Sequence, residues 1–161
     1  MKFLTPFVMT GALLFAAPVM AQDAPSSGGN TNMEILLQKV KADKKLLVAG
    51  NMDLSDAEGK TFWPVYDNYQ KELDQLNQRL GKTIMEYADA FNKGPIPDDT
   101  AKKLLNDVLS IEEAETKLKR TYADKVGKVL SPAKTARYIQ IENKIRALLK
   151  AELAANIPLV Y

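Results

Sequence analysis

The stretch LSDAEGKTF, residues 54–62, is followed 76 positions later by a similar stretch, LSPAKTARY, residues 130–138. The two share Leu, Ser and Ala at the first, second and fourth places, and both carry an aromatic residue at the ninth. Serine is favoured immediately before a helix, because its side-chain oxygen accepts a hydrogen bond from the first turn. The repeat therefore predicts two helical hairpins, each of which turns at a Leu-Ser-x-Ala corner.

Both corners carry further signals of a helix start. Ser55 is followed three residues later by Glu58, which is the spacing of a capping box. Ser131 is followed by Pro132, which is tolerated at the first helical position because the N–H it lacks would have no partner there. The leucine before each serine can pack back onto the first turn. The corner motif residues are Leu54, Ser55, Glu58, Leu130, Ser131 and Lys134.

Apolar residues recur at helical spacing along most of the remaining chain and predict four helices. Their expected ranges are residues 33–49, ended by Gly50 and Asn51; 56–91; 98 to about 129, capped by Asp98; and the second corner to about residue 155. The second helix alone would measure about 54 Å at ~1.5 Å per residue. We therefore expect an all-α, elongated four-helix arrangement with a long central antiparallel hairpin.

Charged residues of the third and fourth helices leave two alternatives open. Glu115 falls in the stripe of the third helix, where an extension towards solvent is favoured over a position in a thin part of the core. Glu142 and Arg146 lie four residues apart on the fourth helix. A solvated pair on that helix is favoured, and a buried Arg–Glu link between hairpins is the alternative.

The N-terminal region has the composition of an export signal. Residues 1–21 have one lysine, a long apolar run and the cleavage-site pattern Val19-Met20-Ala21, which predict a signal peptide and a periplasmic protein. Residues 22–32 are rich in Ser, Gly and Asn and predict a flexible leader. Residues 33–161 are then expected to form a single helical domain without a membrane span.

Composition argues against several classes of function. Removal of the signal peptide leaves 21 basic and 20 acidic residues, a balance that disfavours nucleic-acid binding. The sequence contains neither Cys nor His, the side chains that most often bind zinc and copper. It also shows no nucleotide-binding loop and no catalytic constellation. We therefore expect a non-enzymatic protein without a cofactor or a metal.

The paired corners resemble the twin LTxxQ motifs of the Spy/CpxP-type periplasmic proteins. In this chain the motifs read LSDAE at residues 54–58 and LSPAK at residues 130–134, so Glu58 and Lys134 replace the final Gln and serine replaces Thr. The resemblance implies a thin, curved helical homodimer whose inner face holds unfolded envelope proteins. Zinc binding, found in some members, is not carried over to a chain without His and Cys.

Two functions remain open from the sequence. The first is an ATP-independent chaperone (a holdase) or envelope-stress adaptor, and the second is a dedicated structural or regulatory subunit with one fixed envelope partner. For the aromatic cluster at residues 63–69 core packing is favoured over ligand binding, and for the apolar C-terminal tail docking on the body is favoured over partner binding. The candidate client- or partner-binding residues are Trp63, Tyr66, Arg137, Ile139, Ile157, Leu159 and Val160.

Overall fold

The computed structural model describes residues 43–160, whose regular elements are all helices and which contain no strand. The helices are a first segment at residues 43–52, α2 (Asp56–Phe91), α3 (Asp98–Val126) and α4 (Pro132–Asn156). The all-α prediction is therefore confirmed for this part of the chain. The predicted signal peptide, the leader and the beginning of the first helix lie outside the described residues.

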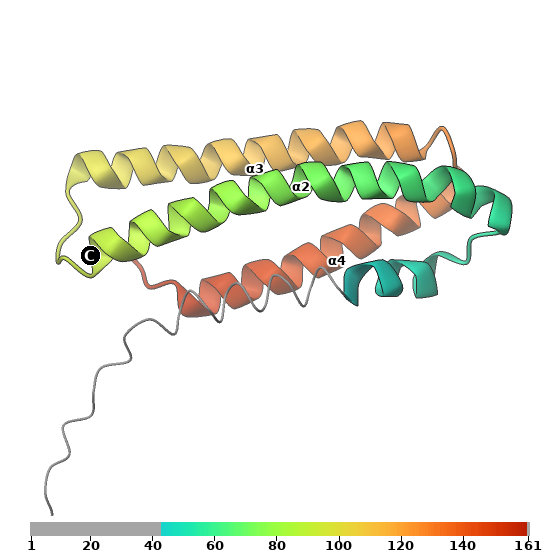
Figure 1. The fold of residues 1–161 in the computed structure, drawn as a ribbon. Coiled ribbons are helices and arrows are strands. Elements are labelled where there is room, and N and C mark those ends of the chain that lie inside the picture. Colours follow the sequence, from blue (N-terminus) through green and yellow to red (C-terminus); the bar gives the residue numbers. More distant parts are fainter. Residues whose placement is uncertain (1–42, 161) are drawn as a thin grey trace, which may run out of the picture.

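Helices α2 and α3 lie side by side along most of their length (Figure 1). Glu86 of α2 pairs with Lys103 of α3, and Glu72 accepts a hydrogen bond from Tyr122. Residue numbers therefore rise along α2 as they fall along α3. The chain reverses in residues 92–97, where Gly94 adopts a positive φ of 115° that suits glycine.

Helix α4 runs in the same direction as α2, and the first segment runs against both. Gln70 and Asn77 of α2 contact Glu142 and Arg146 of α4, respectively, so residue numbers rise together along the two helices. Within the first segment, the Asn51 carbonyl accepts from Arg137, whereas Lys44 pairs with Glu142 further along α4. The first segment therefore points its N-terminal end along the space between α2 and α4.

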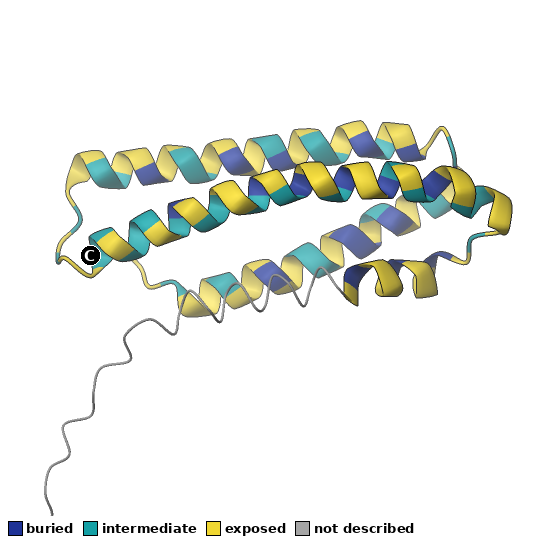
Figure 2. Ribbon diagram, in the orientation of Figure 1, coloured by how far each residue is buried: buried dark blue, intermediate teal, exposed yellow. Residues whose placement is uncertain are grey.

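The core is concentrated where the two corners meet. Its centre is an aromatic group in which the ring of Tyr138 lies 5.1 Å from Phe62, 6.1 Å from Tyr66 and 6.2 Å from Tyr69. Val48 and Met52 of the first segment are fully buried against this group. Figure 2 shows buried residues on the facing sides of the helices. Further along α2, Leu80, Ile84, Tyr87 and Phe91 are only half-buried.

The first segment ends later than predicted, and its buried face includes a charged residue. It continues past Gly50 and Asn51 to Met52, and Asp53 then takes a φ of 45°. The residues that face the core are Lys44, Val48 and Met52, whereas Leu46 and Leu47 are exposed. A spacing of four places the three buried residues on one side of a helix, which Leu46 and Leu47 do not share.

The predicted limits of α3 also need correction. The residue before the helix is Pro97, which makes no side-chain cap, and Asp98 is the first helical residue instead of its cap. Asp98 and Asp99 remain favourable in the first turn because of the helix dipole. The helix ends at Val126, three residues before the predicted end. A turn follows, in which the Val129 N–H donates to the Val126 carbonyl, and it leads to the second corner.

Candidate binding groove

An open groove of about 1170 Å³ runs between α2 and α4. Leu73, Gly81 and Ile84 line it from α2, and Ile145 and Leu149 line it from α4. Glu115 and Lys119 reach it from α3. Lys44 and Lys45 lie at the end near the corners, and residues 156–158 lie at the other end. The helices thus leave a partly apolar surface along the long axis of the molecule.

The end of the groove near the C-terminus is its more apolar half. Ile84, Met85 and Phe91 of α2 face it together with Leu149 and the tail residue Ile157. Met85 is half exposed, at 51%. Apolar side chains that remain in contact with water favour association with another apolar surface.

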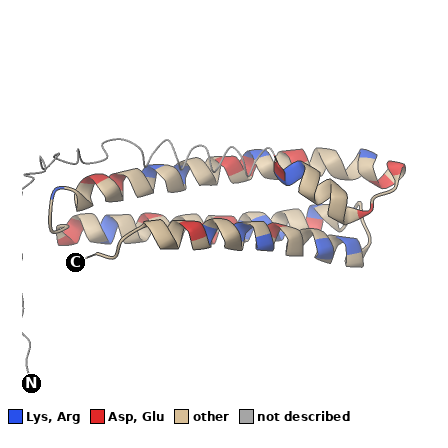
Figure 3. Ribbon diagram, turned by 90° about the horizontal axis from the view of Figure 1, so that it is seen from below, with Lys and Arg blue, Asp and Glu red and all other residues tan. Residues whose placement is uncertain are grey.

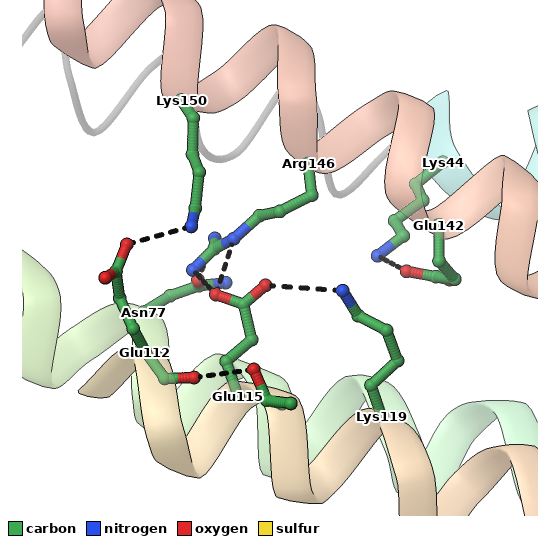
Figure 4. A network of polar contacts seen from close by, with 9 residues as sticks. Lys44, Asn77, Glu112, Glu115, Lys119, Glu142, Arg146 and Lys150 are labelled. Carbon is green, nitrogen blue, oxygen red and sulfur yellow. Dashed lines mark hydrogen bonds and ion pairs between the residues drawn. The ribbon is translucent and has the colours of Figure 1, made fainter. Parts of the chain in front are cut away.

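The middle of the groove contains a buried ion pair between α3 and α4 (Figure 4). Arg146 donates to Glu115 Oε2 from Nε at 2.9 Å and from Nη2 at 2.5 Å, and its Nη1 donates to Asn77 Oδ1 at 2.8 Å. Glu115 is only 5% exposed. The favoured extension of Glu115 towards solvent is therefore wrong, and the alternative of a buried Arg–Glu link is the one that the structure shows.

A second buried ion pair fixes the first segment to α4. Lys44 Nζ lies 2.7 Å from Glu142 Oε2, and Gln70 donates to the other carboxylate oxygen at 3.0 Å. Burial lowers the pKa of Lys44, and the charge of Glu142 partly opposes that shift. Glu142 is 3% exposed, so the expected solvated pair of Glu142 with Arg146 is also wrong. Each of these two residues binds a partner on another element instead.

The corner motifs form the caps that the sequence predicts. Ser55 and Glu58 make a complete capping box, and Ser131 accepts from the Lys134 N–H at 3.3 Å. The structure adds a direct link between the corners: Lys134 Nζ donates to Glu58 Oε2 at 2.6 Å and to the Asp53 carbonyl at 2.8 Å. The hydrogen bond from Lys134, followed by those from Ser55, lowers the pKa of Glu58 to about 2.

The candidate binding residues near the corners have different environments. Tyr66 is buried in the core, as the core-packing interpretation of the aromatic cluster predicts, and little of its surface is left for a partner. Trp63 and Ile139 are half-buried against the core. Arg137 is exposed and donates to the Asn51 carbonyl at 3.4 Å. These residues therefore form no single exposed patch.

The C-terminal tail docks in part. Ile157 is half-buried in the groove, and the Tyr87 hydroxyl donates to the Pro158 carbonyl at 2.8 Å. Beyond this contact Leu159 is 88% exposed, and Val160 is also exposed. The tail therefore lies at the opposite end of the long axis from the corners, so the structure does not bring the two groups of candidate residues together (Figure 1).

Charged residues are spread over the described part of the chain. Figure 3 shows basic and acidic residues interspersed along the helices. Residues 43–160 contain no group of three or more acidic side chains placed to hold a metal ion. None of their helices is long and apolar enough to cross a membrane.

Comparisons of the chain with protein-family models, with curated proteins and with solved structures found no match.

Proposed function

We propose that this protein is an exported helical chaperone that holds non-native envelope proteins without ATP. The observation that supports the proposal best is the groove between α2 and α4, which has a volume of about 1170 Å³. Binding pockets for whole drug-sized ligands have volumes of about 300–1,000 Å³. A groove that is larger still and open along its length suits a segment of polypeptide.

The composition of the groove suits weak and varied binding. Its apolar residues alternate with the cationic side chains of Lys71, Lys82 and Lys119. Lysine stems can cover apolar surface while their charged ends stay in water. Such a surface can hold many unfolded sequences by apolar contact, and it can release them because no contact is specific to one sequence.

The proposal extends to location and assembly. The signal-peptide pattern of residues 1–21 supports a periplasmic protein, and the corner motifs support a distant relation to the Spy/CpxP-type proteins. By that relation, the helices would form two hairpins within a curved homodimer. Mass spectrometry of a periplasmic fraction should find a mature chain that begins at Gln22, and a full-length chain retained in the cytoplasm would contradict the location.

A dedicated subunit is the second candidate function. Leu159 and Val160 are exposed beyond the docked part of the tail, where one fixed partner could cover them. Such a protein should co-purify with one envelope protein at a defined stoichiometry, and removal of residues 159–161 should abolish that association. A chaperone should instead retain its activity after this removal.

Aggregation of an unfolded model protein tests the chaperone proposal. An excess of the mature chain should lower light scattering after the model protein is diluted from denaturant. Met85→Lys in the groove should weaken this effect, because it places a charge on the apolar wall. Leu148→Lys is the matched control, since Leu148 is 74% exposed on α4 and does not line the groove. The proposal fails if the folded protein gives no suppression at several-fold molar excess.

A further inference from the structure

Positive charge and apolar surface are separated along the groove between α2 and α4. Its lining contains six basic side chains and four acidic ones, an excess of two positive charges. Two of the acidic residues, Glu115 and Glu142, lie in the middle of the groove, where Arg146 and Lys44 bind them (Figure 4). The half nearer the C-terminus is more apolar. An occupant that matches both parts has an anionic group at one end and an apolar body.

One cation in the middle of the groove has no carboxylate at hydrogen-bonding distance. Lys119 Nζ lies 3.9 Å from Glu115 Oε1, beyond the reach of about 3.2 Å for an N–H···O bond. Arg146 binds the other oxygen of Glu115, and no further carboxylate among the described residues pairs with Lys119. The Lys119 side chain is only 27% exposed, so water screens its charge incompletely. An anionic group that enters the groove would gain a charge-assisted hydrogen bond there.

The apolar half has the length of one extended acyl chain. Tyr87 lies ten residues after Asn77 on α2, and Asn77 contacts Arg146 in the middle of the groove. Ten residues of helix rise about 15 Å, at ~1.5 Å each. The hydrocarbon core of a bilayer is ~30 Å thick, so one acyl chain in it also spans about 15 Å. Tyr87 donates to the Pro158 carbonyl at 2.8 Å, so the C-terminal tail borders the far end.

We propose that the groove binds a single-chain amphiphile with a carboxylate head, such as a long-chain fatty acid. The carboxylate accepts from Lys119 in the middle of the groove. The acyl chain lies along Gly81 and Ile84 towards Ile157, all of which line the groove. A cationic head would instead meet the excess of positive charge, so the groove selects for the charge of the head. This binding goes beyond the proposed chaperone function and does not depend on it.

Calorimetric titration of the mature chain with dodecanoate, below its micelle concentration, tests the class of ligand. One dodecanoate should bind per chain. Hexanoate should bind more weakly by about tenfold or more, because half of the apolar contact is lost. Dodecyltrimethylammonium should also bind more weakly by about tenfold or more, because its head is cationic. Equal affinities for the two dodecyl compounds, or no binding of dodecanoate, would overturn the proposal.

Two glycines allow the apolar half to be blocked without a change in charge. Gly81 lines the groove, and a Cβ added there meets no atom within 4 Å among the described neighbours. Gly81→Leu should therefore fill the path of the acyl chain and weaken dodecanoate binding by about tenfold or more. It should not weaken α2, because leucine favours a helix more than glycine does.

Gly50→Leu is the matched control for this variant. Gly50 is also helical and exposed, its added Cβ also meets no atom within 4 Å, and it does not line the groove. Its affinity for dodecanoate should equal that of the wild type. Wild-type affinity in Gly81→Leu, from a sample with intact helical content, would overturn the proposed position of the acyl chain.

A second pair of variants tests the position of the head. Lys119→Met should weaken dodecanoate binding by about tenfold, because it removes the proposed donor to the carboxylate. Lys117→Met is the control, since Lys117 is exposed on the same helix and does not line the groove. The control makes the same change in net charge and should bind as the wild type does. Equal losses in the two variants would show a general attraction by the net charge and overturn the assignment of Lys119.

Discussion

At the scale of single residues, we expect replacement of one partner in the ion pair of Lys44 with Glu142 to be strongly destabilising. Both side chains are almost fully buried, and removal of one partner from a buried ion pair costs about 3–5 kcal/mol. We therefore expect Lys44→Met to lower the free energy of unfolding by that order. Lys44→Met/Glu142→Leu should recover most of the loss, since apolar replacement of both partners is often nearly neutral.

Chemical denaturation measures this pair, and an exposed pair is the control. Lys150 and Glu112 lie 3.0 Å apart with both side chains about half exposed, so Lys150→Met should cost less than about 1 kcal/mol. Equal costs for Lys44→Met and Lys150→Met would show that burial of the first pair has no energetic consequence. The sequence could not reveal the pair, because nothing local distinguishes Lys44 from the neighbouring exposed Lys45.

The buried tyrosines give a second prediction at this scale. Tyr122 donates its hydroxyl to Glu72 at 2.6 Å, whereas the Tyr138 hydroxyl is buried near the Glu142 carboxylate and makes no hydrogen bond of good geometry with the described residues. Tyr122→Phe should cost about 1.5–3 kcal/mol, the usual loss for a hydrogen bond to a charged group. Tyr138→Phe should be neutral or slightly stabilising, because it removes a polar atom without a well-formed hydrogen bond. A large loss for Tyr138→Phe would contradict the environment described.

The same tyrosines should make the protein sensitive to alkaline pH. Burial raises the pKa of Tyr66, Tyr69 and Tyr138, and it raises that of Tyr122 to about 12. Above the ordinary tyrosine value of about 10, the unfolded chain releases protons that the folded chain retains. The free energy of unfolding should therefore fall as pH rises above about 10, less steeply in Tyr138→Phe. Denaturation midpoints measured between about pH 8 and 11 would give the slope of stability against pH for the wild type and for the variant.

At the scale of elements, the corner caps should contribute independently of the groove. Ser55→Ala and Ser131→Ala should each lower the free energy of unfolding by about 1 kcal/mol, because each removes the acceptor for an N–H in the first turn. Ser110→Ala on α3 is a control with no capping role, although it removes the hydrogen bond from Arg79. Thermal melts compare the three variants. Wild-type stability in both cap variants would contradict a stabilising role for these two caps.

The link between the corners should respond to acid. The pKa of Glu58 is lowered to about 2, first by Lys134 and then by Ser55, so the folded state favours the charged carboxylate. This contribution is present above the ordinary pKa of a glutamate and is lost as pH falls from about 4.5 towards 2. Glu58→Gln should therefore show a smaller loss of stability over this interval. Parallel pH profiles in the wild type and the variant would contradict the link.

The limits of the helices could be predicted from the sequence better than their buried faces. The limits of α2 agree with the prediction, because Ser55 and Glu58 mark its start and Gly94 with the two prolines that follow it marks its end. The apolar pattern does not reveal the buried face of the first segment, because Leu46 and Leu47 are apolar but exposed, while Lys44 is charged but buried. Its burial depends on Glu142, almost a hundred residues away in the chain, and no helical periodicity contains that information. The link of Glu58 to Lys134 had a signal, namely opposite charges at the same place of the two corner motifs.

At the scale of the whole molecule, the proposed homodimer needs an apolar surface apart from the groove. Leu105 and Leu109 of α3 are exposed and lie four residues apart, and neither lines the groove. Two adjacent apolar side chains on one helical face can pair with their copies about a two-fold axis. The proposed homodimer is therefore expected to use this face of α3.

Sedimentation velocity can decide whether this face pairs two chains. The wild-type mature protein should sediment as a dimer, and Leu105→Lys/Leu109→Lys should sediment as a monomer, because like charges would meet across the two-fold axis. Leu148→Lys is the control, since it adds a lysine at a similarly exposed leucine on α4. A monomeric wild type would contradict the curved dimer, and a dimeric double variant would place the interface elsewhere. In a monomer without the α3 interface the groove would remain available, so aggregation assays on the double variant would show whether client binding requires the pair of chains or one chain alone.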